Sequence, residues 1–408
     1  MSFKFLKIKL KKFLSNNPKL DIIVKKLLCE VFTVFFKIKF GKLDFYENQI
    51  VFECFKGKFV NDSPFALFQC LVNKNNKYSF IWVLEYAHHP LEIVLNEFPN
   101  TKVVYYGTKE YFEAYAKSKY WITNCRLPYR IAKKKGQIYI QCWHGTPLKR
   151  MAHDITIGDN AKTSLDGLKY AYSHEVKRLD FFISPSEYAS NRFCSSFNMP
   201  HRKILEVGYP RNDKLILEKN NLELINNIKK SLKINPSKKV ILYAPTWRDN
   251  KISNDGKHVL TNVLESKEFV KSFDKNDVVF LYRGHYFTRL EGGVSEFFDV
   301  SNYNDLNDLL LISDALITDY SSLFFDYANL CRPIYFYMPD LNEYMNKIRG
   351  FYLDINNDLP GPIASTPEEL ANLMKIDFDK SIFEGFNKKY NSYEDGCSSS
   401  RVIGSIGI

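Results

Sequence analysis

The stretch 315-ALITDYSSLFFDYANLCRPIYFY-337 decides the fold class. It begins with a short apolar segment at 315–318, continues with a helix-like segment at 322–330, and ends with a second apolar segment at 333–337. Two strands joined through a helix form a βαβ unit, in which the strands are parallel. Short apolar strands that alternate with helices are typical of a parallel sheet with helices on both faces.

The same alternation extends through most of the chain. Before the stretch, strands are expected at 50–55, 78–84, 102–106, 120–124, 137–142, 180–184, 204–208, 240–244 and 278–282. Helices are expected at 64–72, 109–116, 222–232, 305–311 and 366–374. A lysine-rich turn at 235–239 is the best linker candidate. The pattern predicts an α/β protein with a basic arm at 1–45 and two doubly wound, Rossmann-like domains at 46–234 and 235–408.

The composition fits a globular protein with sizeable cores. The chain has 408 residues, of which 45% are hydrophobic and 25% charged, so global disorder is excluded. The length indicates two or three domains. The eight cysteines form no CxxC pair, so neither a zinc site nor a redox motif is expected. In a chain of this length they predict reduced thiols in a cytosolic protein.

The net charge of +11 is concentrated near the N-terminus. Residues 1–50 hold eleven Lys and four acidic residues, a charge of +7, which leaves +4 for the rest of the chain. This distribution disfavours a nucleic-acid partner and favours an anionic membrane surface. Residues 3–14 can form an amphipathic helix in the plane of that surface; the alternatives are a docking arm or a partly disordered tail.

No membrane-spanning or secretory segment is expected. A span requires about 20 apolar residues, and the nearest candidate, at 31–36, is short and flanked by Glu30 and Lys37. No apolar region with a small-residue cleavage site follows the basic N-terminus. The sequence therefore predicts a soluble or peripheral protein, located at the cytoplasmic face of the plasma membrane.

Five loops that follow predicted strands carry cationic and hydroxyl side chains. Parallel sheets bind ligands at the carboxyl ends of their strands, so these loops hold the candidate site. The candidates are His144, Thr146, Lys149, Arg211, Arg248, Arg283, His285, Thr318, Asp319, Ser321 and Ser322. Together they suit a substrate with several phosphate charges, because Arg binds phosphate through paired hydrogen bonds and helix N-termini bind anions.

Each loop also has a plainer interpretation. A lone loop histidine can bond to the backbone, an Arg can pair with a carboxylate, and Ser or Asp can cap a helix without a ligand. The recurrence at five strand ends favours the ligand site. The absence of a GxxxxGK[ST] loop disfavours a P-loop NTPase. Paired metal-ligand carboxylates do not stand out, so no metal site is expected, although Mg²⁺ held mainly by substrate phosphates stays compatible with the sequence.

These segments resemble, in order, those of the CDP-glycerol glycerophosphotransferase family of teichoic-acid and capsule polymer enzymes. The matching stretches are FECFKGKFVNDSP (52–64), ITNCRLP (122–128), QCWHGTPLKRM (141–151), ISPSEYASNRF (183–193), GYPRND (208–213), ILYAPTWRD (241–249), YRGH (282–285), ITDYSSLFFDYA (317–328), RPIYFYMPDLNEY (332–344) and RGFYLD (349–354). WHGTPLK together with ITDYSS is highly specific.

The resemblance implies a GT-B-like fold of two Rossmann-like domains that face a central nucleotide cleft. It implies transfer of glycerol phosphate from CDP-glycerol to a hydroxyl of a lipid-linked or oligosaccharide acceptor, with release of CMP. His144 would be the general base, and His285 with Arg283 would stabilise charge on the phosphate. Ser321 and Ser322 would bind the donor phosphates. Arg211, Arg248 and Lys149 are weaker candidates for anion contacts.

Three alternatives share parts of this pattern. A ribitol-phosphate transferase would use CDP-ribitol with the same motifs, and these motifs do not separate primases from polymerases. A GT-B glycosyltransferase would share the fold and use a nucleotide sugar. A membrane-surface scaffold with a degenerate cleft would be expected to lack His144 or His285, and both are present.

Overall fold

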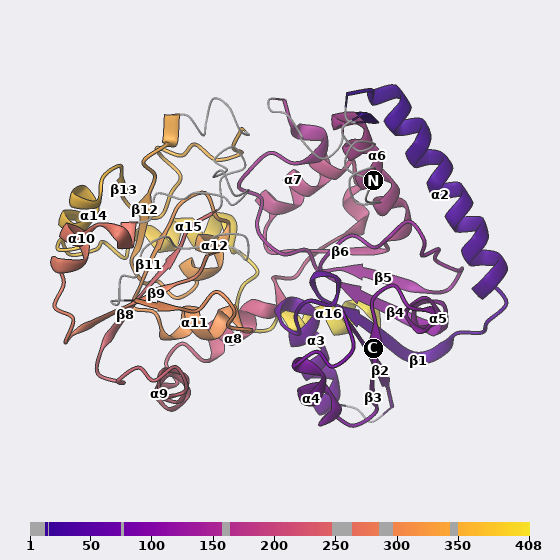
Figure 1. Ribbon diagram of the computed structural model, residues 1–408, viewed down its shortest axis with the longest axis horizontal. Coiled ribbons are helices and arrows are strands. Elements are labelled where there is room, and N and C mark those ends of the chain that lie inside the picture. The colour runs from indigo at the N-terminus through magenta and orange to yellow at the C-terminus, as the bar shows by residue number, and fades with distance from the viewer. Residues whose placement is uncertain are drawn as a thin grey trace, which may run out of the picture. The chain divides into compact units, whose positions relative to one another are not determined.

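The computed structural model describes residues 13–14, 16–74, 77–156, 164–246, 263–284, 297–342 and 350–408. The chain divides into two compact units. Unit 1 comprises Met1–His144, Arg150–Arg211 and Cys397–Ile408, and unit 2 comprises Gly145–Lys149 and Asn212–Gly396. Each unit is built on its own parallel β-sheet, with helices packed against it (Figure 1).

Unit 1 contains, in its described residues, a seven-stranded sheet in the order β3-β2-β1-β4-β5-β6-β7. Its strands are β1 (Tyr46–Glu53), β2 (Ser79–Leu84), β3 (Thr101–Tyr105), β4 (Ser118–Thr123), β5 (Ile138–Gln141), β6 (Phe181–Ser184) and β7 (Ile204–Glu206). Neighbouring strands are parallel throughout. Each overlaps a strand expected from the sequence. The order, which runs outward from β1 and then outward from β4, is the doubly wound arrangement.

Helices cover both faces of this sheet. They are α2 (Pro18–Phe40), α3 (Asp62–Lys74), α4 (Leu91–Asn96), α5 (Lys109–Lys117), α6 (Leu165–Arg178), α7 (Glu187–Phe197) and α16 (Ser398–Ile406). Successive residues of β1 enter opposite cores, because side chains alternate along a strand. Phe52 packs against Phe68 of α3 on one face, and Val51 belongs to the core on the other face, which also contains Phe193 of α7. Burial of both sets explains why the strands read as continuous apolar runs.

The long helix α2 packs against α6 (Figure 1). The buried carboxylate of Asp21 fixes α2 to the start of α6. Asp21 accepts hydrogen bonds from the backbone N–H of Ser164 at 3.1 Å and from the Ser164 hydroxyl at 2.5 Å, and it pairs with Lys25 at 2.8 Å. The same Ser164 hydroxyl caps α6 by accepting from Gly167 N at 2.9 Å. Helix α2 is therefore built into unit 1. The predicted helix at 3–14 falls almost wholly outside the described residues.

Unit 2 contains, in its described residues, a six-stranded parallel sheet in the order β10-β9-β8-β11-β12-β13. Its strands are β8 (Lys239–Ala244), β9 (Val278–Tyr282), β10 (Phe297–Asp299), β11 (Ala315–Thr318), β12 (Ile334–Tyr337) and β13 (Ile363–Ala364). Its helices are α8 (Asp213–Leu217), α9 (Leu222–Ser231), α10 (Lys267–Lys271), α11 (Leu306–Ile312), α12 (Leu323–Ala328), α14 (Pro367–Leu373) and α15 (Ile382–Tyr390). The stretch 315–337 forms the parallel unit β11-α12-β12, as predicted.

The cores of unit 2 also lie on both faces of its sheet. Tyr243 of β8 packs with Phe269 of α10 on one face. On the other face, Phe324 of α12 lies 5.1 Å from Phe336 of β12 and 6.0 Å from Phe386 of α15, measured between ring centroids. The short strands β10 and β13 were not expected, because two or three residues are too few to produce a recognisable pattern.

The predicted fold class, two doubly wound α/β units, is confirmed. The division of the chain differs from the predicted ranges 1–45, 46–234 and 235–408. Helices α8 and α9 contact α11 and belong to unit 2, so the division falls between Arg211 and Asn212. The last helix, α16, returns to α3 in unit 1.

Glu53, at the end of β1, gives the fold a pH-dependent stability. Its side chain is buried and accepts a hydrogen bond from the Tyr115 hydroxyl at 2.7 Å. Burial raises the pKa of Glu53 to about 7, whereas an unfolded Glu has a pKa of about 4.3. The folded state therefore keeps a proton that the unfolded state releases, and its stability falls as the pH rises through this interval.

We expect Glu53→Gln to remove that loss. At pH 8 the variant should exceed the wild type in unfolding free energy by about 3–4 kcal/mol, and near pH 4 the two should agree. Denaturant unfolding at both pH values measures the difference. An equal effect at the two pH values would contradict this assignment.

Candidate active site

The candidate residues of unit 1 lie at the carboxyl edge of its sheet, where the strand order reverses. β1 and β4 are neighbours, but the chain continues from them toward opposite edges. Ligands of doubly wound sheets bind outside such a switch point. Segment 54–62 follows β1, Asn124 follows β4, and His144 lies shortly after β5. The histidine of the WHGTPLK motif is thus placed where the topology favours a ligand.

His144 is held in one orientation by its neighbours. Its Nδ1 lies 2.8 Å from the carbonyl oxygen of Asn124. A carbonyl oxygen only accepts hydrogen bonds, so the neutral ring carries its proton on Nδ1 and leaves Nε2 unprotonated. The ring also stacks on Trp143, with centroids 4.3 Å apart, and contacts Phe55 at 5.8 Å. Nε2 is therefore a basic nitrogen in a defined position.

The surroundings lower the pKa of His144 below its ordinary value. Desolvation by the neighbouring protein is the main cause, while the hydrogen bond to Asn124 and the carboxylate of Asp62 act in the opposite direction. The ring is exposed to solvent, so this desolvation is partial. An ordinary His titrates near pH ~6.5, and a lowered pKa keeps His144 neutral at pH 7. Neutral imidazole is the form that can accept a proton.

Two residues without a predicted role, Asn124 and Asp62, form a largely buried polar network next to His144. The side chain of Asn124 is fully buried. Its Nδ2 donates to Asp62 Oδ2 at 3.0 Å, and its Oδ1 accepts from Phe55 N at 2.9 Å. The strand-end position of Asn124 was visible in the sequence. Its contact with His144 was not, because it depends on which strands become neighbours.

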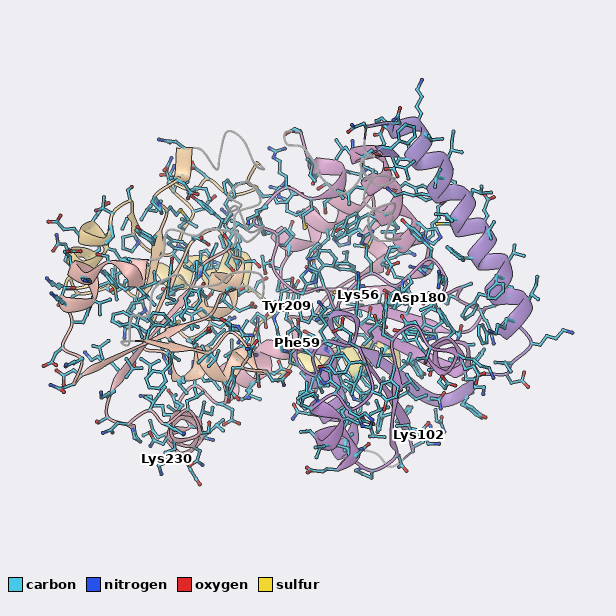
Figure 2. All side chains as sticks on the ribbon, in the orientation of Figure 1. Lys56, Phe59, Lys102, Asp180, Tyr209 and Lys230 are labelled. Carbon is cyan, nitrogen blue, oxygen red and sulfur yellow. The ribbon has the colours of Figure 1, made fainter. Side chains whose placement is uncertain are left out.

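Arg211 belongs to the same network. It donates to Asp62 Oδ1 at 3.2 Å, and its guanidinium lies 4.1 Å from the ring centroid of Tyr209, which is labelled in Figure 2. Only 8% of Arg211 is exposed. Its charge is thus paired with the carboxylate of Asp62, and Arg211 holds that carboxylate in place.

Thr318 and Asp319 join the two central strands of unit 2 at the switch point between β8 and β11. The Thr318 hydroxyl donates to the carbonyl oxygen of Ala244 at 2.8 Å. Asp319 Oδ1 accepts from the backbone N–H and the hydroxyl of Thr246, both at 2.8 Å. Both candidates are buried. These bonds hold the loops after β8 and β11 together.

Three hydroxyl groups lie in the adjoining loops of unit 2. Ser321 Oγ accepts from Leu323 N at 3.3 Å, and Ser322 precedes the six-residue helix α12 without capping it through its side chain. A Cβ on Gly145 would lie 2.5 Å from Ser322 Oγ, so glycine permits this close approach. Within the described residues, the buried hydroxyl of Thr146 has no hydrogen-bond partner. Such a group is costly unless a ligand or water satisfies it.

Arg283 follows β9 and is largely enclosed by protein. Its guanidinium donates to the carbonyl oxygens of Val300 and Tyr303 at 3.1 and 2.9 Å. Desolvation lowers the pKa of Arg283, and the charge of Asp305 partly offsets this effect. Among the described residues no carboxylate forms an ion pair with Arg283. A cation held by neutral carbonyl groups retains its attraction for an incoming anion.

The remaining candidates are placed less fully. Lys149 is half-buried and forms an isolated antiparallel bridge with Phe351. His285 and Arg248 lie outside the described residues, so their roles remain predictions. In the described part of the chain, no group of three His, Cys, Asp or Glu side chains is arranged to hold a metal ion.

Comparisons with known proteins agree with this arrangement. The family model for CDP-Glycerol:Poly(glycerophosphate) glycerophosphotransferase matches residues 34–407. A teichoic acid poly(glycerol phosphate) polymerase from Staphylococcus epidermidis is 38% identical over 367 residues, which are 88% of this chain and 50% of that protein. The chain thus spans half the length of that relative. A teichoic acid glycerol-phosphate transferase from Staphylococcus aureus is 38% identical over 395 residues, 94% of this chain and 98% of that protein.

A solved structure gives the same result at the level of the fold. The wall teichoic acid polymerase TagF, in a histidine-to-asparagine variant soaked with CDPG, matches with a TM-score of 0.83 and 33% identity. The match covers 100% of this chain and 98% of that one. The two parallel α/β sheets thus form the fold of a wall teichoic acid polymerase. The chain belongs to the CDP-glycerol:poly(glycerophosphate) glycerophosphotransferase family, which confirms the resemblance and the enzyme class expected from the sequence.

Proposed function

We propose that the protein transfers glycerol phosphate from CDP-glycerol to a hydroxyl group of a lipid-linked acceptor, releasing CMP, in the synthesis of a teichoic-acid-like or capsular polymer. Family membership supports the donor and the reaction. The observation that carries the proposal is the hydrogen bond that fixes the imidazole of His144 at the switch point of unit 1 and leaves Nε2 unprotonated in the neutral ring.

His144 acts as the general base in this proposal. Nε2 takes the proton of the acceptor hydroxyl while the hydroxyl oxygen attacks the phosphorus atom that carries glycerol. The bond from this phosphorus to the oxygen of the CMP phosphate breaks, and CMP leaves with the electron pair. A positioned base typically accelerates such a step by about 10²–10⁴-fold. The lowered pKa keeps the base form populated at neutral pH.

The anionic donor requires groups that offset its charge. Arg283 suits this role, because its enclosed guanidinium has no ion-pair partner among the described residues. The unsatisfied hydroxyl of Thr146 and those of Ser321 and Ser322 supply neutral donors. Thr318 and Asp319 keep this edge of unit 2 in place through their buried bonds.

Three other predicted contacts complete the proposal. His285 stabilises charge beside Arg283, and Arg248 and Lys149 contribute anion contacts. The reaction uses no resident cofactor, and Mg²⁺ bound through substrate phosphates is compatible with it. CDP-ribitol would require the same groups, but the matched family is defined by glycerophosphate. A nucleotide-sugar reaction shares only the fold, which does not determine the chemistry.

Helix α2 supports the proposed association with an anionic membrane. Its outer face carries a stripe of apolar residues at spacings of three or four, with exposed fractions from 39% to 76%: Leu20, Ile23, Leu27, Val31, Val34 and Ile38. Exposed lysines flank this stripe at positions 19, 26, 37, 39 and 42. An apolar face bordered by lysines is typical of a helix that lies in the membrane interface.

The opposite face of α2 is committed to the fold. Cys29, Phe36 and Phe40 are buried, and Asp21 is bonded to the start of α6. Among the described helices, none combines the length and apolar character that a bilayer span requires. A peripheral position at the cytoplasmic face of the membrane, with α2 as the contact, would bring the enzyme to a lipid-linked acceptor.

The first test of this function is the release of CMP from CDP-glycerol in the presence of a lipid-linked acceptor. His144→Gln should lower turnover by about 10²-fold or more, because the base is lost, while CDP-glycerol still raises the melting temperature of the variant. CMP release by His144→Gln at a rate near that of the wild type would refute the base assignment.

The same assay separates the alternative donors. The wild type should release CMP with CDP-glycerol and remain inactive with CDP-ribitol, UDP-sugars and GDP-sugars. Activity with CDP-ribitol alone would show that the protein is a ribitol-phosphate transferase. Turnover with only a nucleotide sugar would replace the phosphotransferase by a glycosyltransferase.

A second test addresses the membrane. We expect the triple variant Ile23→Glu, Val31→Glu, Ile38→Glu to lose binding to anionic vesicles in a sedimentation assay, because it places charges on the apolar stripe. The matched control Ile93→Glu, Leu222→Glu, Ile376→Glu alters side chains that are 71%, 71% and 64% exposed elsewhere. This control should bind like the wild type. Equal binding by both triple variants would exclude α2 as the contact.

A further inference from the structure

Asn124 ties together the segments that follow three strands of unit 1. We infer that Asn124 is a positioning residue, whose side chain fixes the tautomer and orientation of His144. The inference rests on the proposed role of His144 as the base, and it concerns how that base is prepared. Neither the sequence motifs nor the family comparison assigns Asn124 a role.

The contact with His144 uses a backbone atom. The carbonyl oxygen of Asn124 accepts the Nδ1–H of His144 at 2.8 Å. Any residue at this position would supply a carbonyl oxygen, so substitution cannot delete the acceptor. It can only release the peptide unit that carries it. The question is therefore what holds that peptide unit in place.

The side chain of Asn124 holds this peptide unit through two hydrogen bonds, one that it donates and one that it accepts. Its Nδ2 donates to Asp62 Oδ2 at 3.0 Å, and its Oδ1 accepts from Phe55 N at 2.9 Å. The carboxylate can only accept and the backbone N–H can only donate, which determines which amide atom is which. The second hydrogen of Nδ2 points to Cys54 Sγ at 3.2 Å. The amide is thus satisfied in a fully buried site.

Both partners of the amide are themselves constrained. Asp62 also accepts from Arg211 at 3.2 Å, and Arg211 N donates to the Ser63 hydroxyl at 3.4 Å. Asp62 stands at the start of α3, and Arg211 follows β7. The amide of Asn124 therefore donates to a carboxylate, that of Asp62, which Arg211 also holds in place.

The bond from Phe55 N to the Asn124 side chain also fixes the segment whose aromatic ring contacts His144. Phe55, Lys56 and Gly57 have φ angles of 46°, 61° and 83°, a left-handed turn that is unfavourable for the two non-glycine residues. Figure 2 labels Lys56 in this turn. The ring of Phe55 lies 5.8 Å from that of His144. Loss of the amide would free both the carbonyl and the turn, and thus both contacts to the imidazole.

The direct test reads the tautomer of His144 by two-bond ¹H–¹⁵N NMR on enzyme with labelled histidine, with the His144 signal identified from its absence in His144→Gln. The wild type should show Nδ1–H. Asn124→Ala should shift His144 toward the Nε2–H form, which an unconstrained imidazole prefers. In parallel, kcat should fall by about 10²-fold, while KM for CDP-glycerol changes less than about threefold.

Asn391→Ala is the matched control. Asn391 is also a buried asparagine, whose amide donates to the Phe325 carbonyl at 2.7 Å in unit 2. Its substitution should lower the melting temperature without changing the His144 tautomer or kcat. A general loss of stability would act alike in both variants, whereas positioning acts only at Asn124.

A reciprocal exchange covers the case in which Asn124→Ala does not fold. Asn124→Asp alone sets two carboxylates against each other, and combining it with Asp62→Asn restores one donor and one acceptor with their roles exchanged. The double variant should regain at least about tenfold in kcat over Asn124→Asp, together with the Nδ1–H signal.

Two results would overturn the inference. The first is an Asn124→Ala enzyme with the Nδ1–H tautomer and kcat within about threefold of the wild type. The second is a double exchange that is no better than Asn124→Asp. If His144→Gln proves active, the base assignment fails, but the tautomer comparison still decides whether Asn124 positions the ring.

Discussion

The hydrogen bond from His144 Nδ1–H to the carbonyl oxygen of Asn124 is the interaction on which the proposed chemistry of unit 1 depends. A histidine at the end of a strand can expose either nitrogen, and only one tautomer leaves Nε2 free to take a proton. This bond makes the choice. Partial desolvation then keeps the ring neutral, because it lowers the pKa of His144. The backbone contact thus sets the orientation and tautomer of the proposed base, and desolvation keeps the ring neutral.

The polar groups near the two switch points differ in how far their hydrogen bonds are satisfied by the protein. In unit 1, Asp62 accepts partly buried hydrogen bonds from Asn124 and Arg211, and a satisfied network favours a single arrangement. In unit 2, within the described residues, the buried hydroxyl of Thr146 has no hydrogen-bond partner, and the guanidinium of Arg283 donates to carbonyl groups rather than to a carboxylate. Groups left in this state gain most from an incoming phosphate. The contrast fits a protein that orients its own base and binds an anionic donor.

The sequence predicted the parts of this structure that depend on local pattern. Apolar runs identified the longer strands, and strand-end positions identified His144 and Arg283. The pairing of Asn124 with His144 could not be predicted, because it follows from the neighbouring positions of β4 and β5. The apolar stripe of α2 was missed for a related reason. Apolar residues occur on several faces of this helix. Only its packing against α6 shows which of these residues remain exposed.

The most direct test of the central claim is the titration of His144, followed by NMR beside the pH dependence of kcat/KM for CDP-glycerol. The account predicts a His144 pKa below about 6.5, and an acid limb of kcat/KM that falls through the same value, because a proton on Nε2 removes the base. A His144 pKa above about 7, or an acid limb that does not follow its titration, would contradict the account.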